Sequence, residues 1–177
     1  MTELIPYHIL KTLVEEADLQ AVANVRAGRG GPFGARLNII RLADMQVMRI
    51  GAVAGNAVLE TGLGSAHAED QALNPQNIAA LKQALCAYNP TDIAVVVASS
   101  GESCPACHTK IEILARILIH EGLLAPGHFI VAYGASYADT LAIAGFNDAP
   151  YHADINQPEE ARLIPIEDMN LHALPEA

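Results

Sequence analysis

The chain has 177 residues, of which 51% are hydrophobic and 17% are charged. This length and composition exclude wholesale disorder and predict a single domain over residues 1–177. The formal net charge of −10 makes nucleic acid an unlikely partner, because phosphate backbones would be repelled. No apolar stretch approaches the roughly 18 residues that span a membrane, and the N-terminus lacks the basic start of a signal peptide. We therefore expect a cytoplasmic protein with no membrane contact.

The N-terminal half begins with a helical pattern and continues with two strand patterns. Residues 8–26 carry apolar side chains at helical spacing and end near a glycine-rich stretch, so they predict a helix. Ala35–Leu42 and Gln46–Val53 are strand-like runs separated by a short turn, which predicts a hairpin. A short helix over 65–73 can be capped by its first serine. The pair Asn74–Pro75 then ends it and can begin a second helix.

The second half alternates strand and helix patterns. Ile93–Ser99 predicts a buried strand, and the residues after Cys104 predict a helix that ends at Gly122. Phe129–Tyr133 predicts another strand, and residues 136–144 another helix. Strands that alternate with helices pair in parallel through crossover connections. The predicted fold class is therefore α/β, a three-layer α/β/α sandwich with a mixed sheet of about five strands.

Five of the ten basic residues fall within residues 26–49. Charged side chains in such a stretch belong more often to solvated strand edges and turns than to an anion-binding patch, and both readings stay open. The five are Arg26, Arg29, Arg36, Arg41 and Arg49.

The cysteines divide into one lone residue and one pair. Cys86 stands alone on an apolar helical pattern, so we expect it to pack in the core. Cys104 and Cys107 form a Cys-x-x-Cys pair, which by itself is compatible with a redox pair, half of a structural zinc site, or coincidence. His108 follows the pair directly, and we expect it to be a solvated polar residue of the helix.

The cysteine pair can be interpreted together with the motif His67-Ala-Glu69, whose glutamate lies 35 residues before Cys104. One histidine and two thiolates fit a zinc site whose fourth position stays open for water, the arrangement of a catalytic centre. Both motifs fall at predicted helix N-termini, where the helix dipole favours thiolates over thiols. Glu69, which is not a ligand, is then free to move protons, and this combination is a signature of zinc deaminases.

These motifs resemble those of the cytidine/deoxycytidylate deaminase superfamily, and within it most closely the bacterial guanine deaminases. One departure is Ser103, which stands where the family usually has a proline before the first zinc-binding cysteine. Because that proline is not a ligand, we expect zinc binding to survive. Further similar stretches are Arg29–Ala35, Gly55–Val58, Tyr133–Ser136, Gly145–Asp148, Asp154–Pro158 and Arg162–Pro165.

The resemblance implies a hydrolytic deaminase with one zinc ion per chain. His67, Cys104 and Cys107 would hold the metal, and Glu69 would be the catalytic residue that carries protons between water and substrate. The implied first substrate is a free purine-like base, with guanine converted to xanthine and ammonia. Alternatives are another aminated heterocycle such as a nucleoside, pterin or triazine, a tRNA adenosine deaminase, or an inactive binding module with this fold. The resemblance also implies a homodimer.

Three residues are candidates for binding the substrate. Asn56 lies where the family places an asparagine that binds the base, although it could be a turn residue after a glycine. Asp148 could bind a ring N–H or exocyclic amine of a guanine-like base, or could be a plain turn acid. Phe33 could stack on the base or belong to the core.

Overall fold

The structure is a computed structural model. It describes residues 4–28, 33–55, 68–101, 105–135 and 160–166. The strands in these ranges are β1 (Gly34–Arg41), β2 (Gln46–Gly55), β3 (Ile93–Gly101), β4 (Phe129–Ala135) and β5 (Ala161–Pro165). The helices are α1 (Tyr7–Arg26), α3 (Ala68–Ala72), α4 (Pro75–Leu85) and α5 (Pro105–His120).

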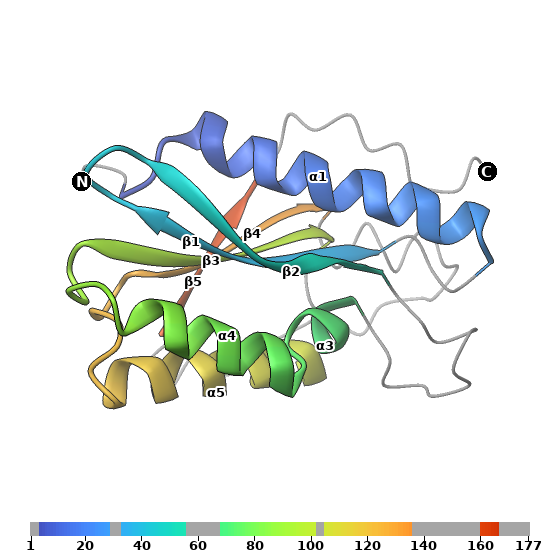
Figure 1. Ribbon diagram of the computed structural model, residues 1–177. Helices are drawn as coiled ribbons and strands as arrows, with labels where there is room; N and C mark the ends of the chain where they lie inside the picture. The colour runs from blue at the N-terminus through green and yellow to red at the C-terminus, as the bar shows by residue number, and fades with distance from the viewer. Residues whose placement is uncertain (1–3, 29–32, 56–67, 102–104, 136–159, 167–177) are drawn as a thin grey trace.

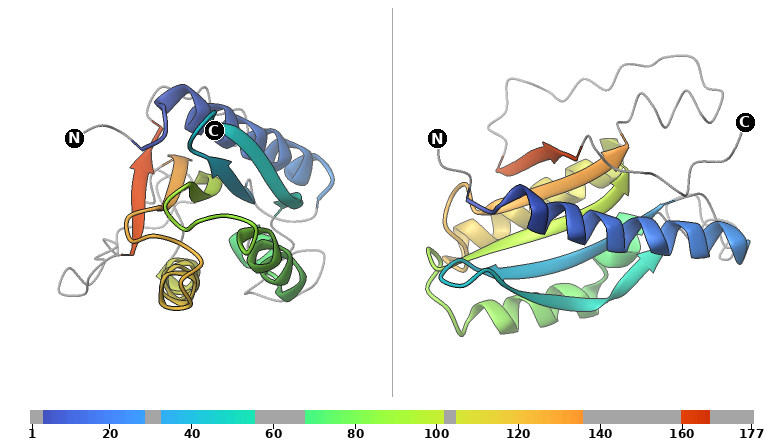
Figure 2. Two further views of the ribbon diagram at one scale, coloured as in Figure 1. Left: turned by 60° about the vertical axis from the view of Figure 1, so that its left-hand side comes forward. Right: turned by 90° about the horizontal axis from the view of Figure 1, so that it is seen from above.

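The five strands form one mixed sheet in the order β2-β1-β3-β4-β5 (Figure 1). β1 pairs antiparallel with both β2 and β3, whereas β3, β4 and β5 run parallel to one another. Helix α1 covers one face of the sheet, and α3, α4 and α5 cover the other (Figures 1 and 2). The predicted three-layer α/β/α sandwich, its hairpin and its parallel second half are confirmed.

Both faces of the sheet are buried, as β3 shows most clearly. Every residue of β3 is buried, and successive side chains alternate between two hydrophobic clusters. Ile93, Val95 and Val97 join the cluster beneath α4 and α5. The intervening residues, Ala94, Val96 and Ala98, join the cluster that packs against α1. This double burial explains why β3 is a continuous apolar run instead of an alternating pattern.

Two local signals that the sequence predicts are present. Asn74 is the N-cap of α4: its side chain accepts a hydrogen bond from the backbone N–H of Asn77 at 2.8 Å, and Pro75 follows in the first helical position. Gly122 has a φ of +72°, the left-handed conformation that ends a helix, and it follows α5 closely.

One expectation is wrong, and one strand was not predicted. Cys86, expected in the core, is exposed at the C-terminal end of α4, so that expectation is wrong. The sequence patterns did not identify β5, a short strand that pairs only with β4 among the described strands. The helix predicted over 136–144 lies outside the described residues. Within the described ranges, no helix has the length and hydrophobicity required to cross a bilayer.

Candidate functional site

One end of the sheet gathers the ends of four strands. Gly34, the first residue of β1, pairs with Gly55, the last residue of β2. At the same end, β3 and β4 finish side by side, with Gly101 opposite Ala135. Ala35 pairs with Ser99, which aligns the start of β1 with the end of β3. In open α/β sheets, the crevice outside the carboxyl ends of parallel strands is where ligands bind.

The predicted substrate residues belong to segments that attach at this end. Phe33 directly precedes β1, and Asn56 directly follows β2. Asp148 belongs to the segment that follows β4. Of these three residues, the structure describes Phe33 alone, and Asn56 and Asp148 lie outside the described residues.

The two proposed catalytic motifs adjoin two helix starts. Helix α3 begins at Ala68, the residue after His67, so Glu69 is the second residue of α3. Helix α5 begins at Pro105, the residue after Cys104, so Cys107 lies in its first turn. The two helices contact each other, and Figure 1 shows the N-terminal end of α5 beneath α3. His67 and Cys104 themselves lie outside the described residues.

Cys107 is 4% exposed, which makes it a buried thiol in the first turn of a sixteen-residue helix. Free N–H groups and the helix dipole at such a position favour the thiolate, the form that binds metals. No group of three or more His, Cys, Asp or Glu side chains able to hold a metal occurs among the residues that the structure describes. Two of the three predicted ligands are outside that set.

Small side chains bring α3 close to the sheet. Ala35 of β1 and Ala68 and Ala72 of α3 form a buried cluster, and Phe33 and Ala54 pack against it. Because alanine has only a methyl side chain, the backbone of α3 can approach that of β1 closely. The partly buried Phe33 ring therefore contacts the cluster that includes the residue directly before Glu69.

A serine side chain joins the end of β3 to the start of β1. The backbone N–H of Gly34 donates to Ser100 Oγ at 3.0 Å, across 66 residues of sequence. Ser99 Oγ donates to the carbonyl of Gly101 at 2.7 Å. Both serines are buried; the bond to Ser100 holds the end of β3 against the start of β1, and the bond from Ser99 is local to the end of β3.

Sequence reasoning missed a buried polar pair on α5. His108, expected to be solvated, is only 9% exposed, as is Glu112, and the expectation for His108 is therefore wrong. His108 Nε2 lies 3.8 Å from Glu112 Oε1, one helical turn away. The Glu112 carboxylate also accepts the backbone N–H groups of Glu160 at 3.0 Å and Ala161 at 3.1 Å. Glu112 thus connects α5 to the first residue of β5.

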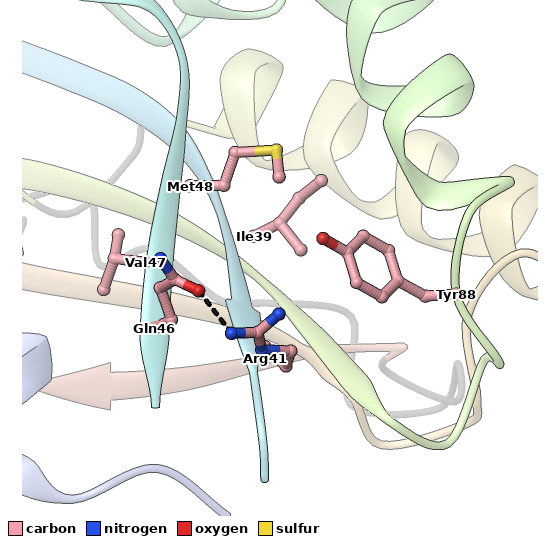
Figure 3. A pocket seen from close by; sticks show the side chains of 6 residues that line it. All are labelled: Ile39, Arg41, Gln46, Val47, Met48 and Tyr88. Atoms are coloured by element: carbon pink, nitrogen blue, oxygen red, sulfur yellow. Dashed lines mark hydrogen bonds between the residues drawn. The ribbon is translucent and has the colours of Figure 1, made fainter. Parts of the chain in front are cut away.

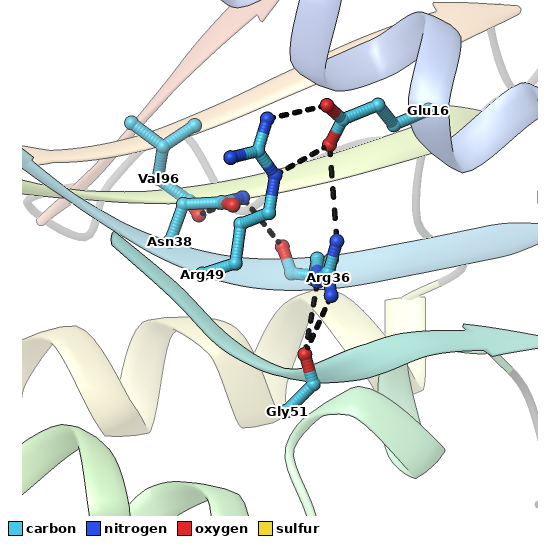
Figure 4. A network of polar contacts seen from close by, with 6 residues as sticks. All are labelled: Glu16, Arg36, Asn38, Arg49, Gly51 and Val96. Carbon is cyan, nitrogen blue, oxygen red and sulfur yellow. Dashed lines mark hydrogen bonds and ion pairs between the residues drawn. The ribbon is translucent and has the colours of Figure 1, made fainter. Parts of the chain in front are cut away.

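Among the five arginines of residues 26–49, Arg36 and Arg49 contact an acid and a backbone carbonyl of the protein. Arg49 Nε donates to Glu16 Oε2 at 2.9 Å, and Arg36 donates two hydrogen bonds to the carbonyl of Gly51, at 3.0 and 2.8 Å (Figure 4). Arg36 Nη1 also lies 3.8 Å from Glu16 Oε2. The hydrogen bond from Arg49 and the charges of Arg49 and Arg36 lower the pKa of Glu16, against the opposing effect of burial. These contacts favour the reading as strand-edge residues over an anion-binding patch.

A shallow depression of about 170 Å³ lies at the opposite end of the β1–β2 hairpin (Figure 3). Arg41, the last residue of β1, lines it and donates from Nε to Asp44 Oδ1 at 2.9 Å. This hydrogen bond lowers the pKa of Asp44 to about 2. The depression lies away from the strand ends described above. Its lining residues are Ile39, Arg41, Gln46, Val47, Met48 and Tyr88.

The chain is similar to two solved guanine deaminases and to a solved mutant protein bound to 8-azaguanine. A guanine deaminase from Nitrosomonas europaea superposes with a TM-score of 0.55 at 20% identity, covering 93% of this chain and 79% of that chain. A mutant protein in complex with 8-azaguanine gives a TM-score of 0.54 at 19% identity, covering 93% and 87%. A guanine deaminase from Bacillus subtilis is 30% identical and covers 91% and 85%, with a TM-score of 0.46.

No family model matches the chain, and no curated protein matches it. The first two superpositions show that the chain shares its fold with the Nitrosomonas europaea guanine deaminase and with the mutant protein bound to 8-azaguanine. The fold implied by the motif resemblance is thereby confirmed.

Proposed function

We propose that the chain is a zinc-dependent hydrolase that deaminates a free purine-like base, with guanine to xanthine and ammonia as the first reaction to test. The main support is the position of the two sequence motifs in the fold. His67-Ala-Glu69 and Cys104-Pro-Ala-Cys107 adjoin the starts of two contacting helices, at the end of the sheet where α/β proteins bind ligands. The guanine deaminase from Nitrosomonas europaea has a similar fold, and so does the mutant protein bound to 8-azaguanine.

The donor chemistry of these motifs fits zinc. His67, Cys104 and Cys107 would hold the ion, and three protein ligands leave one position open, as catalytic zinc sites require. The position of Cys107 in the first turn of α5 favours a thiolate ligand, and its burial shields it from solvent. When bound, zinc supplies a Lewis acid that lowers the pKa of a coordinated water to about 7.

The remaining chemistry belongs to side chains of the chain. Glu69 would accept one proton from the attacking water and deliver it to a ring nitrogen; it would then take the remaining proton of the added hydroxyl group and pass it to the amine, so that ammonia departs as the carbonyl forms. Asn56 would hydrogen-bond the edge of the base, and Asp148 would accept from a ring N–H or exocyclic amine. Phe33 would stack on the ring, a role compatible with its contact with the alanine cluster beside Glu69.

An ammonia-release assay over a panel of guanine, adenine, cytidine, a pterin and a triazine tests this proposal. We expect about one zinc per chain and release of ammonia from guanine. The Glu69→Ala protein should keep its zinc and lose at least about 100-fold in kcat, because general acid–base catalysis contributes 10²- to 10⁴-fold.

Each outcome bears on a different part of the proposal. A zinc-replete Glu69→Ala protein as active as wild type would refute the mechanism. Turnover of another base but not of guanine would overturn the substrate alone. Absence of turnover across the whole panel would instead favour a binding module with the deaminase fold. Size-exclusion chromatography with light scattering tests the proposed homodimer separately.

A further inference from the structure

The short helix α3 is held by side chains from outside it. With five residues, α3 is far below the roughly 12 residues that make an isolated helix stable, and its last carbonyls have no partner within the helix. The side chains of two asparagines donate hydrogen bonds to these carbonyls. Asn74 Nδ2 donates to the carbonyl of Gln71 at 2.9 Å, and Asn77 Nδ2 donates to the carbonyl of Ala72 at 2.9 Å.

Asn77 is itself confined by an irregularity in the sheet. Between the pairs Ala35–Ala54 and Leu37–Ile50, Arg36 of β1 faces residues 51–53 of β2, so β2 bulges at this point. Gly51 is the first residue of the bulge and has a φ of +72°. Arg36 donates two hydrogen bonds to the Gly51 carbonyl, and Figure 4 shows this contact beside the Arg49–Glu16 pair.

The bulge places the Gly51 Cα directly against the Asn77 amide. A Cβ at position 51 would lie 2.6 Å from Asn77 Oδ1 and 2.9 Å from Nδ2, both closer than real Cβ contacts. Glycine therefore leaves the space in which Asn77 reaches Ala72. The series of contacts Arg36–Gly51–Asn77–Ala72 connects β1, β2 and α4 to the C-terminal end of α3.

We propose that Asn77 is a positioning residue for Glu69: by holding the Ala72 carbonyl, it fixes the helix whose second residue is the proposed catalytic glutamate. This inference rests on the proposed deaminase function. Glu69 and Ala72 are three residues apart, roughly 4.5 Å along a helix axis. A small rotation or shift of the end of α3 therefore moves Glu69 by a comparable distance, and a misplacement of about 1 Å can cost about 100-fold in rate.

The test uses Asn77→Asp, which keeps the shape of the side chain and removes the donor to Ala72. Position 77 is the third residue of α4, where a negative charge interacts favourably with the helix dipole, so α4 itself should not weaken. The matched control is Lys82→Ala on the same helix, which removes an exposed ion pair with Glu121 instead.

For Asn77→Asp we expect kcat to fall about 10- to 100-fold, with KM within about twofold of wild type. Zinc content and the midpoint of urea unfolding should match those of Lys82→Ala. Hydrogen exchange, followed by mass spectrometry on a peptide that covers α3, should be faster than in wild type and in the control. The exchange rate is independent of activity and reports whether Asn77 holds α3.

A kcat within twofold of wild type, an unchanged α3 exchange rate, or an effect confined to KM would each overturn the inference. Failure of the proposed function has a different signature, because wild type itself would then release no ammonia from any base in the panel. In that case the α3 exchange rate alone decides: unchanged exchange overturns the contact, and faster exchange supports Asn77 as the residue that holds α3.

Discussion

Removal of the Glu112 carboxylate tests how α5 holds the edge of the sheet. The carboxylate accepts two backbone N–H groups, from Glu160 and Ala161, and its residue is 9% exposed. A hydrogen bond to a charged group contributes about 1.5–3 kcal/mol. Ala161 is fully buried, so its N–H would lose its partner without gaining water, whereas the half-buried Glu160 can be hydrated.

We therefore expect Glu112→Ala to lower the free energy of unfolding by about 3 kcal/mol, most of it from the N–H of Ala161. For a chain of this size, that corresponds to a decrease in Tm of about 6–12 °C. Glu112→Gln retains one acceptor oxygen and should cost about half as much. Urea unfolding followed by circular dichroism measures all three proteins under identical conditions.

Glu121→Ala provides the control for loss of a glutamate from the same region. Its carboxylate accepts from Lys82 Nζ at 3.1 Å, but both side chains are substantially exposed, so the loss should be within about 1 kcal/mol. If Glu112→Ala unfolds at the same urea concentration as Glu121→Ala, the hydrogen bonds from Glu160 and Ala161 to Glu112 do not stabilise the fold.

Two further predictions concern the contacts around the bulge in β2. The hydrogen bond from Arg49 lowers the pKa of Glu16, so Glu16 contributes stability above the ordinary glutamate pKa of about 4.3 and loses it as pH falls through the lower, folded value. The difference in unfolding free energy between wild type and Glu16→Gln should therefore shrink as pH is lowered from 7 to about 3, and a difference independent of pH would contradict this. Gly51→Ala should lower the unfolding free energy by about 2 kcal/mol, because the φ of +72° costs about 1–2 kcal/mol in a residue with a Cβ and the methyl group must displace Asn77. Thermal unfolding measures this, and a loss below about 0.5 kcal/mol would show that the bulge relaxes freely.

Local signals were sufficient to predict most elements of this fold. The α1 periodicity, the hairpin spacing, the Asn74–Pro75 helix start and the apolar run of β3 each depend on residues close together in the chain. β5 lacks such a signal because its five residues form a strand through pairing with β4 and through the Glu112 contact. Both partners are distant in sequence, so no local pattern could identify the strand.

The wrong burial expectations for Cys86 and His108 have a common cause. In both, the direction in which the residue points from its helix axis decides whether it is buried. On α4 the buried positions are Leu81 and Leu85, and Cys86 lies about 100° around the helix from Leu85. On α5, His108 precedes the buried Ile111 by three residues and therefore shares its face. Helical spacing would have predicted both outcomes, whereas residue type alone did not.

For the candidate site, the sequence indicated which residues would carry the chemistry, but it did not indicate which residues hold them in position. His67, Glu69, Cys104 and Cys107 stay predictions that follow from motif chemistry, because chemistry restricts which residues can bind zinc and move protons. The contact between Gly51 and Asn77 depends on a bulge and joins two residues that are 26 positions apart in the chain, and neither residue type indicates it.

The arginine contacts bear on the choice between a free base and tRNA as substrate. A protein that binds nucleic acid needs cations that can approach phosphates and release counterions. Arg36 and Arg49 instead lie within 4 Å of Glu16, and Arg41 is paired with Asp44. A phosphate would have to compete with a carboxylate at each of these positions, within a chain of net charge −10. The contacts of these three arginines therefore argue against a polyanionic partner at this surface, and a gel shift with tRNA at low salt would contradict that.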